Sequence, residues 1–297
     1  MTERVAPELR VLTLVAFLLV VVGCSTPSGT SATGNTASGS QPPVAPASVK
    51  KNRDSRGEGK IIHVFVALCD NDSQGIVPVP AKIGNGNDPA NNLYWGCAEG
   101  VKAYFSRSRQ WKLVSAQNNP SETILERCVF QHRETNAFII ADAYRGSNIK
   151  DATADFLASA SGNKEEHIEI TSSNKRIELD IAGSADLVSY IGHNGLMDFS
   201  LPFPDKAESA GAKDAIVLCC ISERYFWPAL RKSGARPLLM TTQLMYPGAF
   251  ILKAALDGWL IGERAQEVRE RAAKAYADNQ KISVKAARGV FAPPPSA

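Results

Sequence analysis

Short, almost entirely apolar runs alternate along this chain with longer segments in which apolar residues recur every three or four positions. The runs stop at glycine, proline, asparagine or aspartate, as buried strands do, whereas the longer segments have the period of amphipathic helices. The pattern predicts strands at 61–69, 137–141, 187–191, 215–220 and 237–242. It predicts helices at about 148–160, 223–232, 247–260 and 265–278.

Strands that are apolar on both faces and separated by helices are typical of a parallel sheet. We therefore predict an α/β fold with a mainly parallel, doubly wound sheet and helices on both faces. Two shorter runs at 111–114 and 124–130 predict an inserted β-hairpin, and the polar stretch 162–176 predicts a loop or an edge hairpin. Asn92 is the expected N-cap of a helix that includes 93–105.

The first residues have the pattern of an export signal. Arg4 and Arg10 precede an apolar run of roughly 12 residues, shorter than the ~20 that a transmembrane helix needs. The run ends in Val21-Val22-Gly23-Cys24, which resembles the lipobox of bacterial lipoproteins. The resemblance implies cleavage after Gly23, a diacylglyceryl group on Cys24, and a chain held at the extracytoplasmic side of the cell membrane or outer membrane. The alternative is an ordinary secretory signal with an incidental cysteine.

The remainder of the chain falls into three segments of different composition. Residues 24–58 are rich in serine, threonine, glycine and proline, which predicts a flexible tether between the lipid and the folded part. Residues 59–290 form the predicted single α/β domain, and 291–297 are the predicted disordered tail. The net charge is +3 with basic residues spread evenly, so the sequence does not predict a nucleic-acid partner.

Two of the predicted strands end in reactive side chains. His193 follows the strand at 187–191, and Cys219 and Cys220 end the strand at 215–220. In doubly wound sheets catalytic groups gather beyond the carboxyl ends of the strands, so imidazole and thiol are expected at one edge. A thiolate at a helix N-terminus beside a histidine is an activated nucleophile, and Ser222 is the expected cap of that helix.

These strand ends resemble those of the caspase-like cysteine peptidases, in which one strand ends in His-Gly and a later one in a small residue and Cys. The resemblance implies a caspase-like fold, Cys220 as nucleophile, His193 as general base or acid, and backbone N–H groups near Gly195 and Cys220 as oxyanion hole. Cys219 stands where the small residue precedes the nucleophile. In this chain Asn194 separates His193 from Gly195, which departs from the family pattern. Cys219 as nucleophile and an oxidised Cys219–Cys220 pair remain alternatives.

Other polar residues follow predicted strands at the same edge. Asp70, Asp142 and Arg145 are expected to line a substrate cleft there, although each also fits a solvated turn or a helix cap. The histidines and cysteines lack zinc-site spacing, and the oxygen-rich loops lack the calcium-loop and dinucleotide patterns. The sequence therefore predicts neither a metal nor a cofactor. Five cysteines remain besides Cys24, so at least one thiol is expected to be free.

The combined interpretation is a membrane-anchored lipoprotein whose domain hydrolyses peptide bonds in a peptide or protein substrate. A catalytically inactive relative that binds a peptide, a glycan or an envelope protein in the same cleft is the first alternative. An unrelated doubly wound module for a small ligand is the second.

Overall fold

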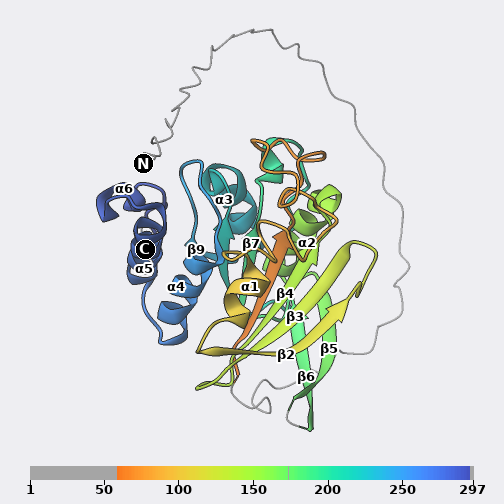
Figure 1. The fold of residues 1–297 in the computed structure, drawn as a ribbon. Helices are drawn as coiled ribbons and strands as arrows, with labels where there is room; N and C mark the ends of the chain where they lie inside the picture. Colours follow the sequence, from red (N-terminus) through yellow and green to blue (C-terminus); the bar gives the residue numbers. More distant parts are fainter. Residues whose placement is uncertain (1–58, 173, 295–297) are drawn as a thin grey trace, which may run out of the picture. The chain divides into compact units, whose positions relative to one another are not determined.

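Seven strands form one central sheet in the computed structural model, which describes residues 59–172 and 174–294. The sheet order is β2-β3-β4-β1-β7-β8-β9 (Figure 1). The strands are β1 (Ile61–Ala67), β2 (Trp111–Asn118), β3 (Ile124–His132), β4 (Phe138–Tyr144), β7 (Leu187–Ile191), β8 (Asp214–Leu218) and β9 (Arg236–Leu239). The predicted signal peptide 1–23, Cys24, the tether to residue 58 and the last three residues of the predicted tail lie outside the described residues.

The five strands from β4 to β9 in the sheet order run parallel, and β3 and β2 extend the β4 side as an antiparallel hairpin. All residues of β1, β4, β7 and β8 are buried, because helices or a hairpin cover both faces of this part of the sheet. The mainly parallel, doubly wound sheet and its hairpin are thus confirmed. The chain passes from β1 to β4 on one side and to β7 on the other, so its topological switch point lies between β1 and β7.

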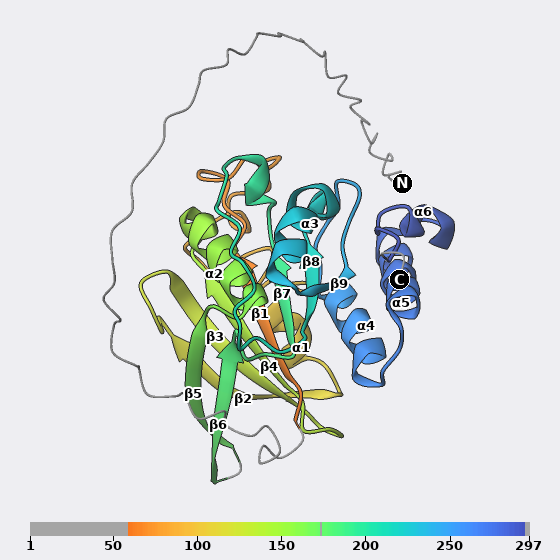
Figure 2. The ribbon, with the colours of Figure 1, turned by 180° about the vertical axis from the view of Figure 1, so that it is seen from behind.

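Separate elements cover the two faces (Figures 1 and 2). One face packs against α1 (Val101–Ser106), α4 (Ala249–Leu260), α5 (Ala265–Gln280) and α6 (Val284–Arg288). The other packs against α2 (Ile149–Ser161), α3 (Ser222–Ser233) and a second hairpin of β5 (Glu165–Ser172) and β6 (Lys175–Ala182). Single 3-10 turns, η2 (Gly146–Asn148) and η3 (Gly195–Met197), follow β4 and β7.

Helix α2 illustrates how the pattern specifies the packing. Ile149, Ala152 and Phe156 recur at helical spacing and are buried against the sheet. The helix ends where Gly162 takes a left-handed conformation with φ 80°, which glycine adopts without a steric penalty.

The structure corrects two local predictions. Asn92 does not cap a helix; its amide bonds both backbone groups of Cys69, accepting from the N–H at 3.0 Å and donating to the carbonyl at 2.8 Å. Helix α1 begins only at Val101, after Gly100. The predicted tail is also shorter, because Phe291 is 1% exposed and Ala292 donates to the Met240 carbonyl.

Across 59–172 and 174–294, none of the helices combines the length and the apolar character that crossing a bilayer demands.

Candidate functional site

The candidate pair lies beyond the carboxyl ends of two neighbouring parallel strands. β7 and β8 pair in register through Ile191 and Leu218, and His193 and Cys220 each follow two residues later. The two residues therefore occupy matching positions at one edge of the sheet. This edge also carries the switch point between β1 and β7.

The chain turns sharply from β8 into α3 at the cysteines. Cys219 is fully buried and Cys220 is half-buried. Ile221 has φ 50° and ψ 39°, a left-handed conformation that is rare for a β-branched residue. Ser222 is the first helical residue and not the cap, and its hydroxyl donates to the Val217 carbonyl at 2.9 Å.

Hydrogen bonds from two other loops hold this turn in its strained conformation. The Thr241 hydroxyl donates to the Cys219 carbonyl, and the Ile221 N–H donates to the Gln243 carbonyl at 3.0 Å. The Asn194 side-chain amide donates to the Cys220 carbonyl at 2.7 Å. Strained backbone persists where its surroundings over-determine it, and it clusters at functional sites. Asn194, which stands between His193 and Gly195, thus links the two strand-end loops directly.

The Cys220 sulfur faces the backbone of the loop after β9. The Met245 N–H lies 3.5 Å from Sγ, and the Met245 carbonyl oxygen lies 3.7 Å from it. A backbone N–H at this position is a donor that a thiolate can accept from. Burial raises the pKa of nearby Tyr94 and Tyr276, and the proximity of Cys220 adds to the rise for both.

His193 is oriented by a carboxylate. Its ring Nε2 lies 2.7 Å from Asp198 Oδ2, and the ring is 8% exposed, whereas Asp198 is 40% exposed. Tyr190 donates its hydroxyl to the His193 carbonyl at 2.8 Å. Among the described residues, none hydrogen bonds to Nδ1 of this ring. Sequence reasoning missed Asp198, although its position five residues after His193 in the same loop was a usable signal.

The predicted glycine of the oxyanion hole is engaged elsewhere. Gly195 is buried at the start of η3, and its N–H donates to the His193 carbonyl at 3.1 Å. In this conformation it is not available to a substrate oxyanion. The expectation that Gly195 supports catalysis through its amide is therefore corrected.

Asp142 does not line a cleft, because it is fully buried in the middle of β4. Its oxygens accept from Arg127 Nε and Nη2, both at 2.6 Å, and from His63 at 2.9 Å. Burial alone would raise the pKa of Asp142, but the hydrogen bonds and charges of Arg127 and His63 lower it to about 2. Arg127 also pairs with Glu166 at 2.6 Å, so the cluster joins the sheet to the β5–β6 hairpin.

Asp70 and Arg145 lie at the ends of β1 and β4, whose loops meet. Asp70 is 5% exposed and closes its own loop, accepting from the Asp72 N–H at 3.0 Å and the Ser73 hydroxyl at 2.7 Å. A Cβ on Gly146 would lie 2.4 Å from the Asp70 Cβ, so the two loops are in close contact. Arg145 is half-buried and donates to Asn87 Oδ1 at 2.5 Å.

The five described cysteines are free thiols. Burial raises the pKa of Cys69 to about 11 and that of Cys128 to about 12, and it raises the pKa of Cys219 far above the usual value. Cys219 is therefore a poor nucleophile. Within 59–172 and 174–294, no three His, Cys, Asp or Glu side chains are grouped so that they could hold a metal ion.

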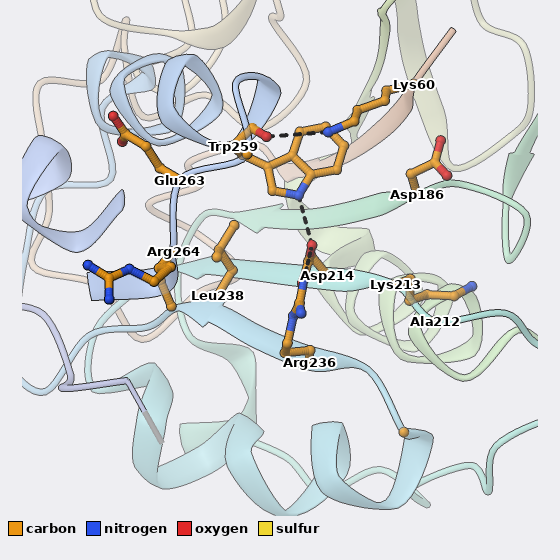
Figure 3. Close-up of a pocket in the computed structure, with 13 residues that line it drawn as sticks. Lys60, Asp186, Ala212, Lys213, Asp214, Arg236, Leu238, Trp259, Glu263 and Arg264 are labelled. Carbon is orange, nitrogen blue, oxygen red and sulfur yellow. Dashed lines mark hydrogen bonds and ion pairs between the residues drawn. The ribbon is translucent and has the colours of Figure 1, made fainter. Parts of the chain in front are cut away.

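A cavity of about 590 Å³ lies at the opposite, amino edge of the sheet (Figure 3). Its floor is Asp214, which accepts from Arg236 Nε at 2.6 Å and from the Trp259 indole N–H at 2.8 Å. Lys60 lies over the Trp259 ring, 4.2 Å from its centroid. These contacts join β8, β9 and α4, which is a structural role remote from His193 and Cys220.

Comparison of the chain with models of protein families, with curated proteins and with solved structures finds no match.

Proposed function

We propose that this chain is a cysteine hydrolase that cleaves peptide bonds through Cys220 and His193, with Asp198 orienting the histidine. The observation that carries the proposal is the register of β7 and β8, from which both residues extend by the same two positions. The strained, braced turn at Ile221 supports it, because such strain is retained where a side chain must be presented in one geometry.

We assign the chemistry from the positions of the two residues at the sheet edge and from the contact of Asp198 with His193. Nδ1 of His193 takes the proton of the Cys220 thiol, and the thiolate attacks the carbonyl carbon of the substrate. The C–N bond breaks, and the amine leaves with the proton held by His193, which yields a thioester on Cys220. His193 then deprotonates a water molecule, which hydrolyses the thioester and restores the thiol. Asp198 fixes the ring and stabilises its protonated form.

The lipid anchor predicted at Cys24 would hold this hydrolase at a membrane surface. A peptide-binding module without catalysis is the second candidate, and one observation favours it. The Gly195 N–H is already bonded to the His193 carbonyl, so the donor expected for the oxyanion is occupied. A binding module would use the same edge of the sheet without needing that donor.

Thiol mapping of the full-length protein separates the two candidates. Cys97 is the matched control, because it is half-buried like Cys220, lacks a histidine partner and has a pKa raised by burial. We expect iodoacetamide to label Cys220 at about pH 6 to 7 and Cys97 only at higher pH. In His193→Ala the preference for Cys220 should disappear, and peptide hydrolysis should be lost in both His193→Ala and Cys220→Ala.

Equal pH profiles for Cys220 and Cys97, with no change in His193→Ala, would reject the hydrolase. Binding of a peptide without turnover would then support the second candidate.

A further inference from the structure

A basic cavity of about 310 Å³ lies beside helix α1. The residues that line it are Tyr104, Arg107, Ser108, Arg109, Gln110 and Lys253. Gln110 directly precedes β2, whose first residue, Trp111, pairs with His132 at the end of β3. Because β3 runs antiparallel to β4, this end of β2 lies at the amino edge of the sheet. The cavity is therefore separate from the proposed chemistry, which we place at the carboxyl edge.

Two arginines in the lining of this cavity carry positive charge that no carboxylate offsets. Arg107 donates to the carbonyl of Ala98, which is neutral, and Arg109 has no hydrogen-bond or ion-pair partner among the described residues. Lys253 differs, because Asp257 Oδ2 lies 2.6 Å from its Nζ and offsets its charge. In the part of the chain that the structure describes, no carboxylate belongs to the lining.

Neutral hydroxyl donors complete the lining. Burial raises the pKa of Tyr104, so its hydroxyl stays protonated and can donate a hydrogen bond. The Ser108 hydroxyl accepts from the Gln110 N–H at 3.2 Å, which leaves its own hydrogen free to donate. The larger cavity has a different character, because its lining includes three carboxylates and Asp214 pairs with Arg236 there (Figure 3). The smaller cavity thus combines positive charge and donors without a competing carboxylate.

We infer that the cavity beside α1 binds a small molecule through a phosphate group, held by Arg107, Arg109 and the Tyr104 hydroxyl. The forked guanidinium group of arginine binds phosphate oxygens through paired, charge-assisted hydrogen bonds. A phosphate monoester carries about 1.5 to 2 negative charges at neutral pH and matches two uncompensated arginines better than a singly charged carboxylate does. A volume of about 310 Å³ is at the small end of the range for small-molecule sites.

Calorimetric titration of the full-length protein with methyl phosphate, and with acetate as the matched carboxylate, tests the inference at constant ionic strength. Arg107→Gln and Arg109→Gln should each weaken the binding of methyl phosphate by about tenfold. Arg231→Gln is the control, because it removes the same charge from an exposed arginine of α3, which covers the opposite face of the sheet, and binding should not change. Alkylation of Cys220 should be the same in all these variants, so the result does not depend on the hydrolase.

A second arm distinguishes a soluble phosphate compound from a phospholipid headgroup. It measures cosedimentation of the same proteins with phosphatidylcholine vesicles that contain or lack phosphatidic acid. Binding to phosphatidic acid that falls in the two cavity variants, without binding of methyl phosphate, would assign the phosphate group to a lipid.

Three results would contradict the inference. Acetate that binds as tightly as methyl phosphate would overturn phosphate as the ligand. Binding that is absent from both arms would overturn the site, and so would binding that Arg231→Gln weakens as much as the cavity variants do.

Discussion

At the scale of single residues, the turn after β8 shows how strain and hydrogen bonding are combined. A left-handed conformation costs an ordinary L-residue about 1–2 kcal/mol, and a β-branched side chain is among the least suited to it. Ile221 nevertheless adopts it, because the peptide groups on both sides are hydrogen-bonded. The Cys220 carbonyl accepts from Asn194, the Ile221 N–H donates to the Gln243 carbonyl, and the Ser222 N–H donates to the Thr241 hydroxyl. The cost is thus offset by contacts from two other strand-end loops.

This account predicts an unusual order of stability at position 221. The free energy of unfolding of Ile221→Gly should be about 1 kcal/mol higher than that of Ile221→Ala, because glycine adopts the left-handed conformation without a Cβ clash. Both variants lose the same branched side chain, so the difference between their free energies of unfolding reports the cost of the left-handed backbone conformation. Urea unfolding measures it.

Lys274 in α5 is the control for position 221, because it is exposed within a regular helix, where alanine should be the more stable by a similar amount. If alanine were more stable than glycine at position 221 as well as at position 274, the strain at Ile221 would be refuted.

At the scale of elements, one buried ionic cluster joins four strands. Asp142 on β4 is bonded to His63 on β1 and to Arg127 on β3, and Arg127 pairs in turn with Glu166 on β5. His63 Nδ1 also accepts from the Ala182 N–H at the end of β6, at 3.0 Å. The β5–β6 hairpin is therefore docked on the sheet by polar contacts as well as by apolar packing.

Asp142→Asn should lower the free energy of unfolding by about 3 kcal/mol, because it leaves the buried Arg127 guanidinium with only the partly exposed Glu166 carboxylate as counter-charge. Urea titration at pH 7 measures the loss. Asp155→Asn is the comparison, since this carboxylate is partly exposed in its ion pair with Lys164 and its removal should cost about 1 kcal/mol or less. Equal losses in the two variants would contradict the role of the cluster.

The same carboxylate predicts a pH dependence. The pKa of Asp142 is about 2 in the folded protein against 3.8 as its ordinary value. A lowered folded pKa stabilises the protein above the unfolded value, and the contribution, about 2 kcal/mol, is lost as the pH falls from about 5 to 2. The wild type should lose this stability over that range, whereas Asp142→Asn should not.

At the scale of the whole molecule, the two edges of the sheet have different characters. The carboxyl edge carries His193, Cys220 and long loops with exposed apolar side chains. The amino edge carries the cavity over Asp214, in which the carboxylate is fully engaged by Arg236 and Trp259. We therefore expect changes in the cavity to affect stability and not the chemistry at the other edge.

Trp259→Phe tests this separation. It removes the indole donor to Asp214, so the free energy of unfolding should fall by about 2 kcal/mol. The rate at which iodoacetamide alkylates Cys220 should stay within about twofold of the wild type. A large change in that rate without a loss of stability would indicate that the two edges are coupled.

The sequence by itself was sufficient for the fold class and for most elements. Buried strands such as β7 are mostly apolar, with Ser189 as the polar exception, and α2 repeats its apolar residues at the helical period, so local pattern and tertiary environment agree there. The rule that reactive groups follow the carboxyl ends of parallel strands was enough to place His193 and Cys220 at one edge of the sheet, which the register of β7 and β8 bears out.

Tertiary structure alone decided the contacts between residues distant in the chain. Asn92 bonds Cys69 instead of capping a helix, Asp142 is an internal ion-pair partner, and the Gly195 amide is used within its own loop. Asn194, an unexplained departure in the sequence, braces Cys220. A polar side chain satisfies its hydrogen bonds with whatever group the fold brings near, and that group has no fixed spacing along the sequence.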